Sequence, residues 1–277
     1  MDLLKTTLPR FGLKMPGSQF AVISGLQINR LKLSFWKPGA LENNRPIPAL
    51  QRKQIDICIE LGHLAYFEDP ALGFFFASHS ALLGTKTSSV VMSPLAMAVN
   101  AVFRALFHPE TPTRIKPPLE DIVSLARKNA DTDLLLHTMI WASGAWLLLD
   151  RPVTAAGLLY EAQDISNKHH SGALAVYGSQ IIKESLITAL WHAGDFKMLG
   201  TILQEARAEN LQRGSLLYSM HLDVLEPLER AAADCPMEAL KVAAAGFHKV
   251  YPDRFVPLDT GSLYAVSKSL ARKTAPW

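Results

Sequence analysis

His137 and Trp141 are the residues whose types and spacing best suit a catalytic or binding role. They stand four positions apart in a strongly apolar stretch, so on a helix they share one face. A histidine in such surroundings must form a hydrogen bond or face a cavity. With the carboxyl group of Glu184, from a later helix, His137 makes a couple suited to general acid–base catalysis on a small apolar substrate. This is an enzyme hypothesis that no spacing rule selects, and the catalytic residues stay unknown.

Further pairs with the same spacing favour a binding role instead. Polar or aromatic side chains three or four positions apart line one helix face. There they either satisfy one another between neighbouring helices or line a groove for a peptide or small ligand. The candidate groove residues are Asn100, Arg104, His137, Trp141, Gln180, Glu184, Tyr218 and His221. The sequence leaves both interpretations open.

The sequence lacks the residue patterns that metal binding and nucleotide chemistry need. His169 and His170 are adjacent, and adjacent residues point about 100° apart on a helix, so they cannot share a metal as an i,i+4 pair does. The Gly84-Thr85-Lys86 run lacks the preceding glycine and strand of a phosphate-binding loop. We therefore expect no metal site and no cofactor.

Composition points to a folded chain in a reducing compartment. Of the 277 residues, 49% are hydrophobic and 19% charged, which excludes a mostly disordered chain. Cys58 and Cys235 lie far apart and predict two buried thiols in a cytoplasmic protein. Lys5 and Arg10 interrupt any apolar leader. The longest apolar run, residues 134–149, is shorter than the roughly 20 residues of a membrane span, so we expect no transmembrane segment.

The charge is unevenly distributed. Residues 1–53 contain nine lysines and arginines but only two acids, whereas the remainder has more acids than bases. A basic end can dock an acidic protein surface or an anionic lipid, or it can simply be solvated. Nucleic acid is not expected as a partner, because no recognition motif accompanies the charge. The basic, apolar helix expected at 18–36 could lie on a membrane, but capping the open end of an array is favoured.

Helical periodicity extends over almost the whole chain, and prolines mark where helices begin. Proline suits the first turn of a helix because its missing N–H leaves no bond unmade there. The expected helices are 18–36, 48–68, 70–83, 94–107, 118–129, 132–149, 152–168, 171–193, 195–210, 214–233, 236–250 and 260–273.

Alternate helices share a pattern of small residues. With residues 70, 152, 196 and 236 in register, a small residue stands at the same place in each helix: Ser80, Ala162, Ala206 and Gly246. Close approach of two helices in a hairpin requires such residues. The spacing of 40 to 44 residues exceeds the roughly 34 of a standard tetratricopeptide repeat. Short turns make neighbours antiparallel, and stacked hairpins bury their apolar stripes against each other.

The order of motifs resembles a known family. The matching segments are GLKMP at 12–16, WKP at 36–38, ELGHLAYF at 60–67, SPLAMA at 93–98, the unit 194–206 and FVPLDTG at 255–261. They resemble the C-terminal helical-repeat region of multidomain signalling ATPases, of the kind associated with class III adenylate cyclase domains. The resemblance implies a tetratricopeptide-like fold and a regulatory or protein-binding role. It implies no catalysis, since the nucleotide chemistry of that family belongs to domains that this sequence lacks.

The sequence therefore predicts an all-α, tetratricopeptide-like α-solenoid of antiparallel helix hairpins. We expect a basic N-terminal segment with a capping helix at 1–47, joined to a repeat region at 48–277 as a single domain. The expected function is non-catalytic: a scaffold or regulatory module that engages a protein segment or peptide in a concave groove. A small apolar ligand, a homodimer and the enzyme hypothesis remain open alternatives.

Overall fold

The computed structural model describes residues 6–35, 47–86, 92–107, 119–168, 173–214 and 216–232, with single positions at 235, 238 and 241. Within these residues the chain forms ten α-helices and no strand, so the all-α prediction is confirmed. The chain divides into two compact units, residues 1–151 (unit 1) and residues 152–277 (unit 2).

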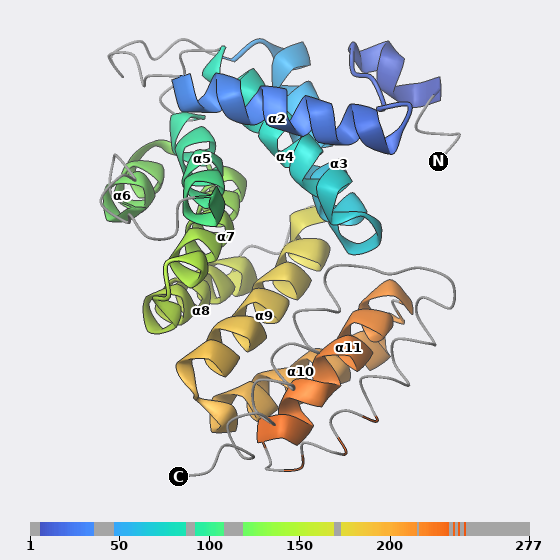
Figure 1. Cartoon of the computed structure of the whole chain (residues 1–277). Coiled ribbons are helices and arrows are strands. Elements are labelled where there is room, and N and C mark those ends of the chain that lie inside the picture. Colours follow the sequence, from blue (N-terminus) through green and yellow to red (C-terminus); the bar gives the residue numbers. More distant parts are fainter. Residues whose placement is uncertain are drawn as a thin grey trace. The chain divides into compact units, whose positions relative to one another are not determined.

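Within each unit most helices pack on the next helix along the chain (Figure 1). Unit 1 contains the 3-10 helix η1 (Leu8–Phe11) and the α-helices α2 (Gln19–Phe35), α3 (Ala49–Glu68), α4 (Pro70–Thr85), α5 (Ser93–Phe107), α6 (Leu119–Asn129) and α7 (Thr132–Leu148). Unit 2 contains α8 (Pro152–Lys168), α9 (Ala173–Ala193), α10 (Phe196–Arg213) and α11 (Leu216–Ala232). In unit 1, α4 contacts α3 and α5, and α7 contacts α5 and α6, whereas α2 packs on α4 and α5. In unit 2, α9 contacts α8 and α10, and α11 contacts α10.

Most helix starts coincide with the predicted ones because local capping groups set them. The side chains of Asp69, Asp131 and Asp195 each accept a hydrogen bond from a backbone N–H in the first turn of α4, α7 and α10. Such caps typically contribute about 0.5–2 kcal/mol each. Helix α10 continues three residues beyond its predicted end, to Arg213, because Gly214 then adopts a left-handed conformation with φ 66°. The helices expected at 236–250 and 260–273 lie almost wholly outside the described residues.

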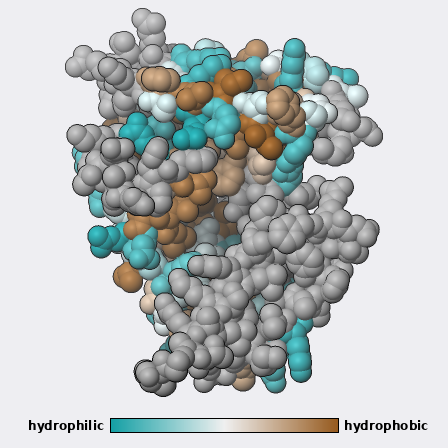
Figure 2. Space-filling view, in the orientation of Figure 1, coloured by the Kyte–Doolittle hydropathy of each residue, from teal (hydrophilic) through white to brown (hydrophobic). Residues whose placement is uncertain are grey.

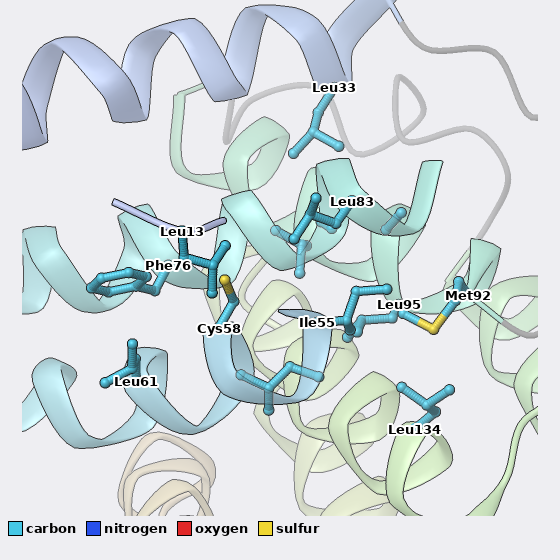
Figure 3. Packing of buried hydrophobic residues seen from close by; sticks show 14 of the residues in the cluster. Leu13, Leu33, Ile55, Cys58, Leu61, Phe76, Leu83, Met92, Leu95 and Leu134 are labelled. Carbon is cyan, nitrogen blue, oxygen red and sulfur yellow. The ribbon is translucent and has the colours of Figure 1, made fainter. Parts of the chain in front are cut away.

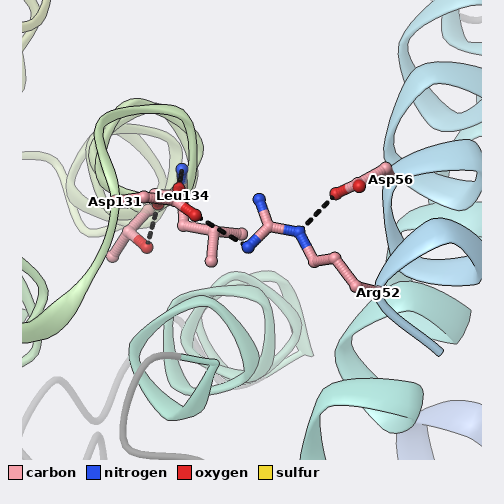
Figure 4. A network of polar contacts seen from close by, with 5 residues as sticks. Arg52, Asp56, Asp131 and Leu134 are labelled. Carbon is pink, nitrogen blue, oxygen red and sulfur yellow. Dashed lines mark hydrogen bonds and ion pairs between the residues drawn. The ribbon is translucent and has the colours of Figure 1, made fainter. Parts of the chain in front are cut away.

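One of these caps also ties two distant helices of unit 1 together (Figure 4). Asp131 accepts a hydrogen bond from Leu134 N at 2.9 Å, which caps α7. Its other carboxylate oxygen lies 2.7 Å from Arg52 on α3. Arg52 also pairs with Asp56, one turn further along α3. Because these side chains are partly exposed, the ion pairs add little beyond the cap itself.

The core of unit 1 lies where α2, α3, α4 and α5 meet (Figure 3). Its buried side chains lie between Leu8 and Leu134 and include Leu33 of α2, Ile55 of α3 and Phe76 of α4. Burying each large side chain contributes about 1.5–3 kcal/mol. Helices α3 and α4 approach each other closely at Gly62, where an added Cβ would lie 3.3 Å from backbone atoms of Gly73 and Ala77 on α4.

The small residues of the predicted register are buried where they are described. Ser80, Ala162 and Ala206 are each at most 1% exposed, in α4, α8 and α10. Gly246 lies outside the described residues. Of the two thiols predicted to be buried, Cys58 is buried in α3, as predicted. Cys235 is exposed, because it follows the last turn of α11 instead of packing within a helix.

Candidate functional site

In unit 1, the first predicted pair serves helix packing. Asn100 on α5 donates from Nδ2 to the backbone oxygen of Leu33 at 3.3 Å, and Leu33 stands in the last turn of α2. The carbonyls of a last helical turn lack partners within their own helix, so this bond fills one of them. Arg104, one turn further along α5, is half-buried. Asn100 therefore links α5 to the end of α2.

The second pair lies inside unit 1. His137 is 2% exposed on α7. Trp141 is half-buried and meets Phe74 of α4 edge-on, with ring centroids 5.8 Å apart. Phe74 in turn lies 6.1 Å from the ring of Phe103 on α5. Trp141 thus belongs to an aromatic group that joins α4, α5 and α7, an arrangement that stabilises packing.

In unit 2, polar side chains from three helices gather into one group. We call it the polar cluster, and it comprises Lys183 and Glu184 of α9, Glu209 of α10 and Tyr218 of α11. Gln180, also on α9, is buried. Lys183 is 2% exposed and donates from Nζ to Oε1 of Glu209. The Glu209 side chain is 36% exposed, so this ion pair reaches from the interior to the surface.

Burial controls the protonation of the polar cluster. Burial raises the pKa of the Glu184 carboxyl from its ordinary 4.5 to about 8, so this group is mostly neutral at pH 7. Its Oε1 is shielded from solvent although the residue as a whole is half-buried. Burial also raises the pKa of Tyr218, and the nearby charges of Glu184 and Glu209 raise it further, partly offset by Arg213. Tyr218 therefore lies within electrostatic reach of both carboxyl groups.

The polar cluster presents both kinds of hydrogen-bonding group. Glu184, being protonated at neutral pH, can donate as well as accept. Glu209 Oε2 is shielded from solvent and has no hydrogen-bond partner among the described residues. A shielded acceptor of this kind costs free energy until a donor meets it. The arrangement therefore suits a bound group that carries an N–H or ammonium donor.

Sequence reasoning identified part of the polar cluster. It named Gln180, Glu184 and Tyr218, and the structure places all three in unit 2 with Glu184 and Tyr218 electrostatically coupled. It missed Lys183 and Glu209, although a lysine beside Glu184 in an apolar helix was an available signal. The side chain of His221 is outside the described part of the structure. His137 belongs to unit 1 and Glu184 to unit 2, so their proposed couple stays a prediction.

A second feature lies on unit 1, between α2 and α4. It is an open hollow of about 510 Å³. Its lining is mainly apolar, with three basic side chains, Lys32, His79 and Lys86. Burial lowers the pKa of His79, and the positive charges of Lys86 and Lys32 lower it further, so both lysines act on the imidazole. Asn29, also at the hollow, donates to Ser78 Oγ at 3.0 Å and joins the two helices.

No group of three or more histidine, cysteine, aspartate or glutamate side chains among the described residues could hold a metal ion. Of the helices described, none has both the length and the apolar character needed to cross a bilayer.

Comparisons with models of known protein families, with curated proteins and with solved structures found no match. The resemblance to the repeat region of signalling ATPases therefore stays a prediction.

Proposed function

We propose that this chain is a non-catalytic, tetratricopeptide-like helical-repeat module that binds a segment of a partner protein at the polar cluster. The observation that carries the proposal is the pair of carboxyl groups on α9 and α10, Glu184 and Glu209. One is neutral at pH 7 and the other holds a buried lysine while part of its side chain remains exposed. A peptide segment supplies the N–H donors that such a site takes.

The packing of unit 2 supports a repeat architecture. Helices α9, α10 and α11 follow one another with each in contact with the next, and α9 also contacts α11. In a stacked array of hairpins the first helices of successive hairpins lie side by side and face the groove. With α9 and α11 as first helices, Glu184 and Tyr218 stand on neighbouring groove helices. A partner segment lying along that groove meets both.

The charge pattern also indicates the partner's chemistry. Lys183 neutralises Glu209 from within, and Glu184 carries little charge, so the site does not strongly repel or attract long-range charge. Recognition then depends on short-range hydrogen bonds, from backbone amides or from one basic side chain. This suits a regulatory or scaffolding contact with a specific peptide.

The experiment compares partner capture by the immobilised wild-type chain and by three variants of it. Glu184→Gln keeps the side chain's shape but removes its titration, and Lys183→Met/Glu209→Gln removes both charges without leaving one buried alone. Glu205→Gln is the matched control, because Glu205 is exposed on the same helix as Glu209. Proteins captured from native lysate are quantified for each form, alongside thermal melts.

We expect a partner that is retained by wild type and by Glu205→Gln to be lost by at least about tenfold from Lys183→Met/Glu209→Gln. Melts within a few degrees of wild type show that the loss is local. Equal capture by all forms would mean that the partner binds elsewhere or that binding is not specific.

A further inference from the structure

Helix α2 presents large apolar side chains on two opposite faces. The inner face carries Val22 and Leu33, which are 4% and 0% exposed and pack into the core of unit 1. The outer face carries five large side chains that remain exposed, which we call the α2 outer stripe: Phe20 (80%), Ile23 (49%), Ile28 (50%), Leu31 (55%) and Phe35 (81%). Figure 2 shows this apolar surface interleaved with hydrophilic side chains. Contiguous exposure of this kind is unusual on a chain without a partner surface.

The geometry of a helix places basic groups at both edges of the α2 outer stripe. At about 100° per residue, the five side chains fall within an arc of about 140°. Arg30 follows at one edge, beside Ile23, and Lys32 at the other, beside Ile28. The helix has no acidic residue. Over its 17 residues the α2 outer stripe is about 25 Å long.

The hollow between α2 and α4 continues the α2 outer stripe at its C-terminal end. Leu31 and Phe35 of the stripe, and Lys32 at its edge, also line the hollow. From α4, Leu82 adds apolar surface and Lys86 adds a second exposed ammonium group. A lining that combines apolar side chains with exposed lysines matches a molecule with an anionic head and a hydrocarbon tail.

We propose that the α2 outer stripe docks unit 1 onto an anionic membrane surface, with Lys32 and Lys86 meeting lipid phosphates at the rim of the hollow. A helix that lies in the plane of a bilayer buries an apolar face and extends lysine and arginine side chains from both edges to the headgroups. The arrangement on α2 has these parts. This surface is on unit 1 and does not depend on the proposed peptide site in unit 2.

The charges on α2 favour an anionic membrane over a second copy of the chain as the partner of the stripe. If two α2 outer stripes packed face to face, Arg30 and Lys32 of each copy would find no acid on the facing helix to pair with, and in a parallel pair they would also repel each other. An anionic bilayer supplies the opposite charge along the whole length of the helix. Positive residues near such a surface each add to binding, and the attraction falls as salt rises.

The test is co-sedimentation of the full chain with vesicles of phosphatidylcholine alone and of phosphatidylcholine with about 30% phosphatidylglycerol. Phe20→Ser/Phe35→Ser removes the two most exposed apolar groups of the stripe, and Lys32→Glu/Lys86→Glu reverses the charge at the hollow. The matched controls are Leu211→Ser and Lys197→Glu on α10, since Leu211 is 86% exposed and Lys197 is also exposed. Gel filtration with light scattering reports the oligomeric state of each form.

We expect wild type and both controls to bind the anionic vesicles, and each double variant to bind at least about tenfold more weakly with an unchanged melt. Binding should also weaken with rising salt. Absence of vesicle binding by wild type overturns the proposal, as does equal binding to neutral vesicles. A wild-type dimer that Phe20→Ser/Phe35→Ser dissociates, without vesicle binding, overturns it too and assigns the stripe to contact between copies.

Discussion

At the residue scale, unit 2 contains a carboxyl group that is largely shielded from water. The carboxyl of Glu184 titrates near pH 8 because burial penalises its charged form. Lys183, the preceding residue, is even less exposed but gains a counter-charge from Glu209. Burial of two neighbouring ionisable residues is therefore compensated in different ways: Glu184 stays neutral, and Lys183 forms an ion pair.

The buried carboxyl predicts that stability falls as pH rises. The folded chain holds the Glu184 proton up to about pH 8, whereas the unfolded chain releases it near the ordinary value of 4.5. The stability that the protonated Glu184 gives the folded chain is therefore fully present below pH 4.5 and is lost progressively as the pH rises to about 8. Glu184→Gln removes this dependence, so it should exceed wild type in free energy of unfolding at high pH, by up to about 5 kcal/mol, because one pKa unit corresponds to about 1.4 kcal/mol.

Urea unfolding on either side of this pH range measures the effect. Wild type and Glu184→Gln should differ little at the acidic end and clearly at the alkaline end. The control Glu205→Gln alters an exposed side chain and should track wild type throughout. A difference between wild type and Glu184→Gln that does not change with pH would show that Glu184 is not buried as an acid.

At the element scale, the sequence predicted helices well because their boundaries depend on neighbouring residues. Asp69 followed by Pro70 supplies both a cap and a first-turn residue for α4, and Pro152 begins α8. What local signals could not supply is the register between helices. The bond from Asn100 to Leu33 spans 67 residues, and the ion pair of Lys183 and Glu209 spans 26. Such contacts depend on how two helices cross.

The same limit applies to the candidate site. Spacing of three or four residues selected Gln180, Glu184 and Tyr218, since it identifies helix faces from sequence. It could not decide which faces turn inward, and so it also selected Trp141, which packs against Phe74. The close approach at Gly62 likewise lies outside the small-residue register read from the sequence.

The small-residue register itself predicts an effect on unit 2. Ala162 on α8 and Ala206 on α10 are both fully buried. Replacing either by leucine should lower the free energy of unfolding by about 1–3 kcal/mol, because overpacking forces the helices apart. Ala208→Leu is the control, since Ala208 is exposed two residues further along α10. Chemical denaturation of the three variants checks this; equal stabilities would mean that these positions do not set the helix spacing.

At the scale of the whole molecule, helix α2 belongs to the packing of unit 1. The N-terminal segment was expected to cap a repeat region that begins at residue 48. In the structure, Leu33 is fully buried in a core shared with α3, α4 and α5, and Asn29 bonds to Ser78 on α4. One helix therefore stabilises unit 1 with its inner face while its outer face stays available for docking. The division of the chain follows Arg151.

This division predicts that residues 1–151 fold without the rest of the chain. Every residue of the core of unit 1 lies between Leu8 and Leu134, and the pair of Arg52 with Asp131 also lies within that range. The break comes after α7, where Asp150 adopts a left-handed conformation with φ 57° and ends the helix before Pro152 begins the next. The fragment 1–151 thus retains all of these contacts, and we expect a helical circular dichroism spectrum and one cooperative thermal transition.

A shorter fragment tests the contribution of the N-terminal helices η1 and α2. Residues 48–151 keep α3 to α7 but lose the buried side chains of Leu8, Leu13, Val22 and Leu33 and the bond from Asn29 to Ser78. Removing several buried side chains at about 1.5–3 kcal/mol each exceeds much of the stability of a small domain. We expect this fragment to melt far below 1–151 or without cooperativity. Equal melts for the two fragments would show that η1 and α2 only cover unit 1, whereas loss of cooperativity in both would show that unit 1 needs unit 2 in order to fold.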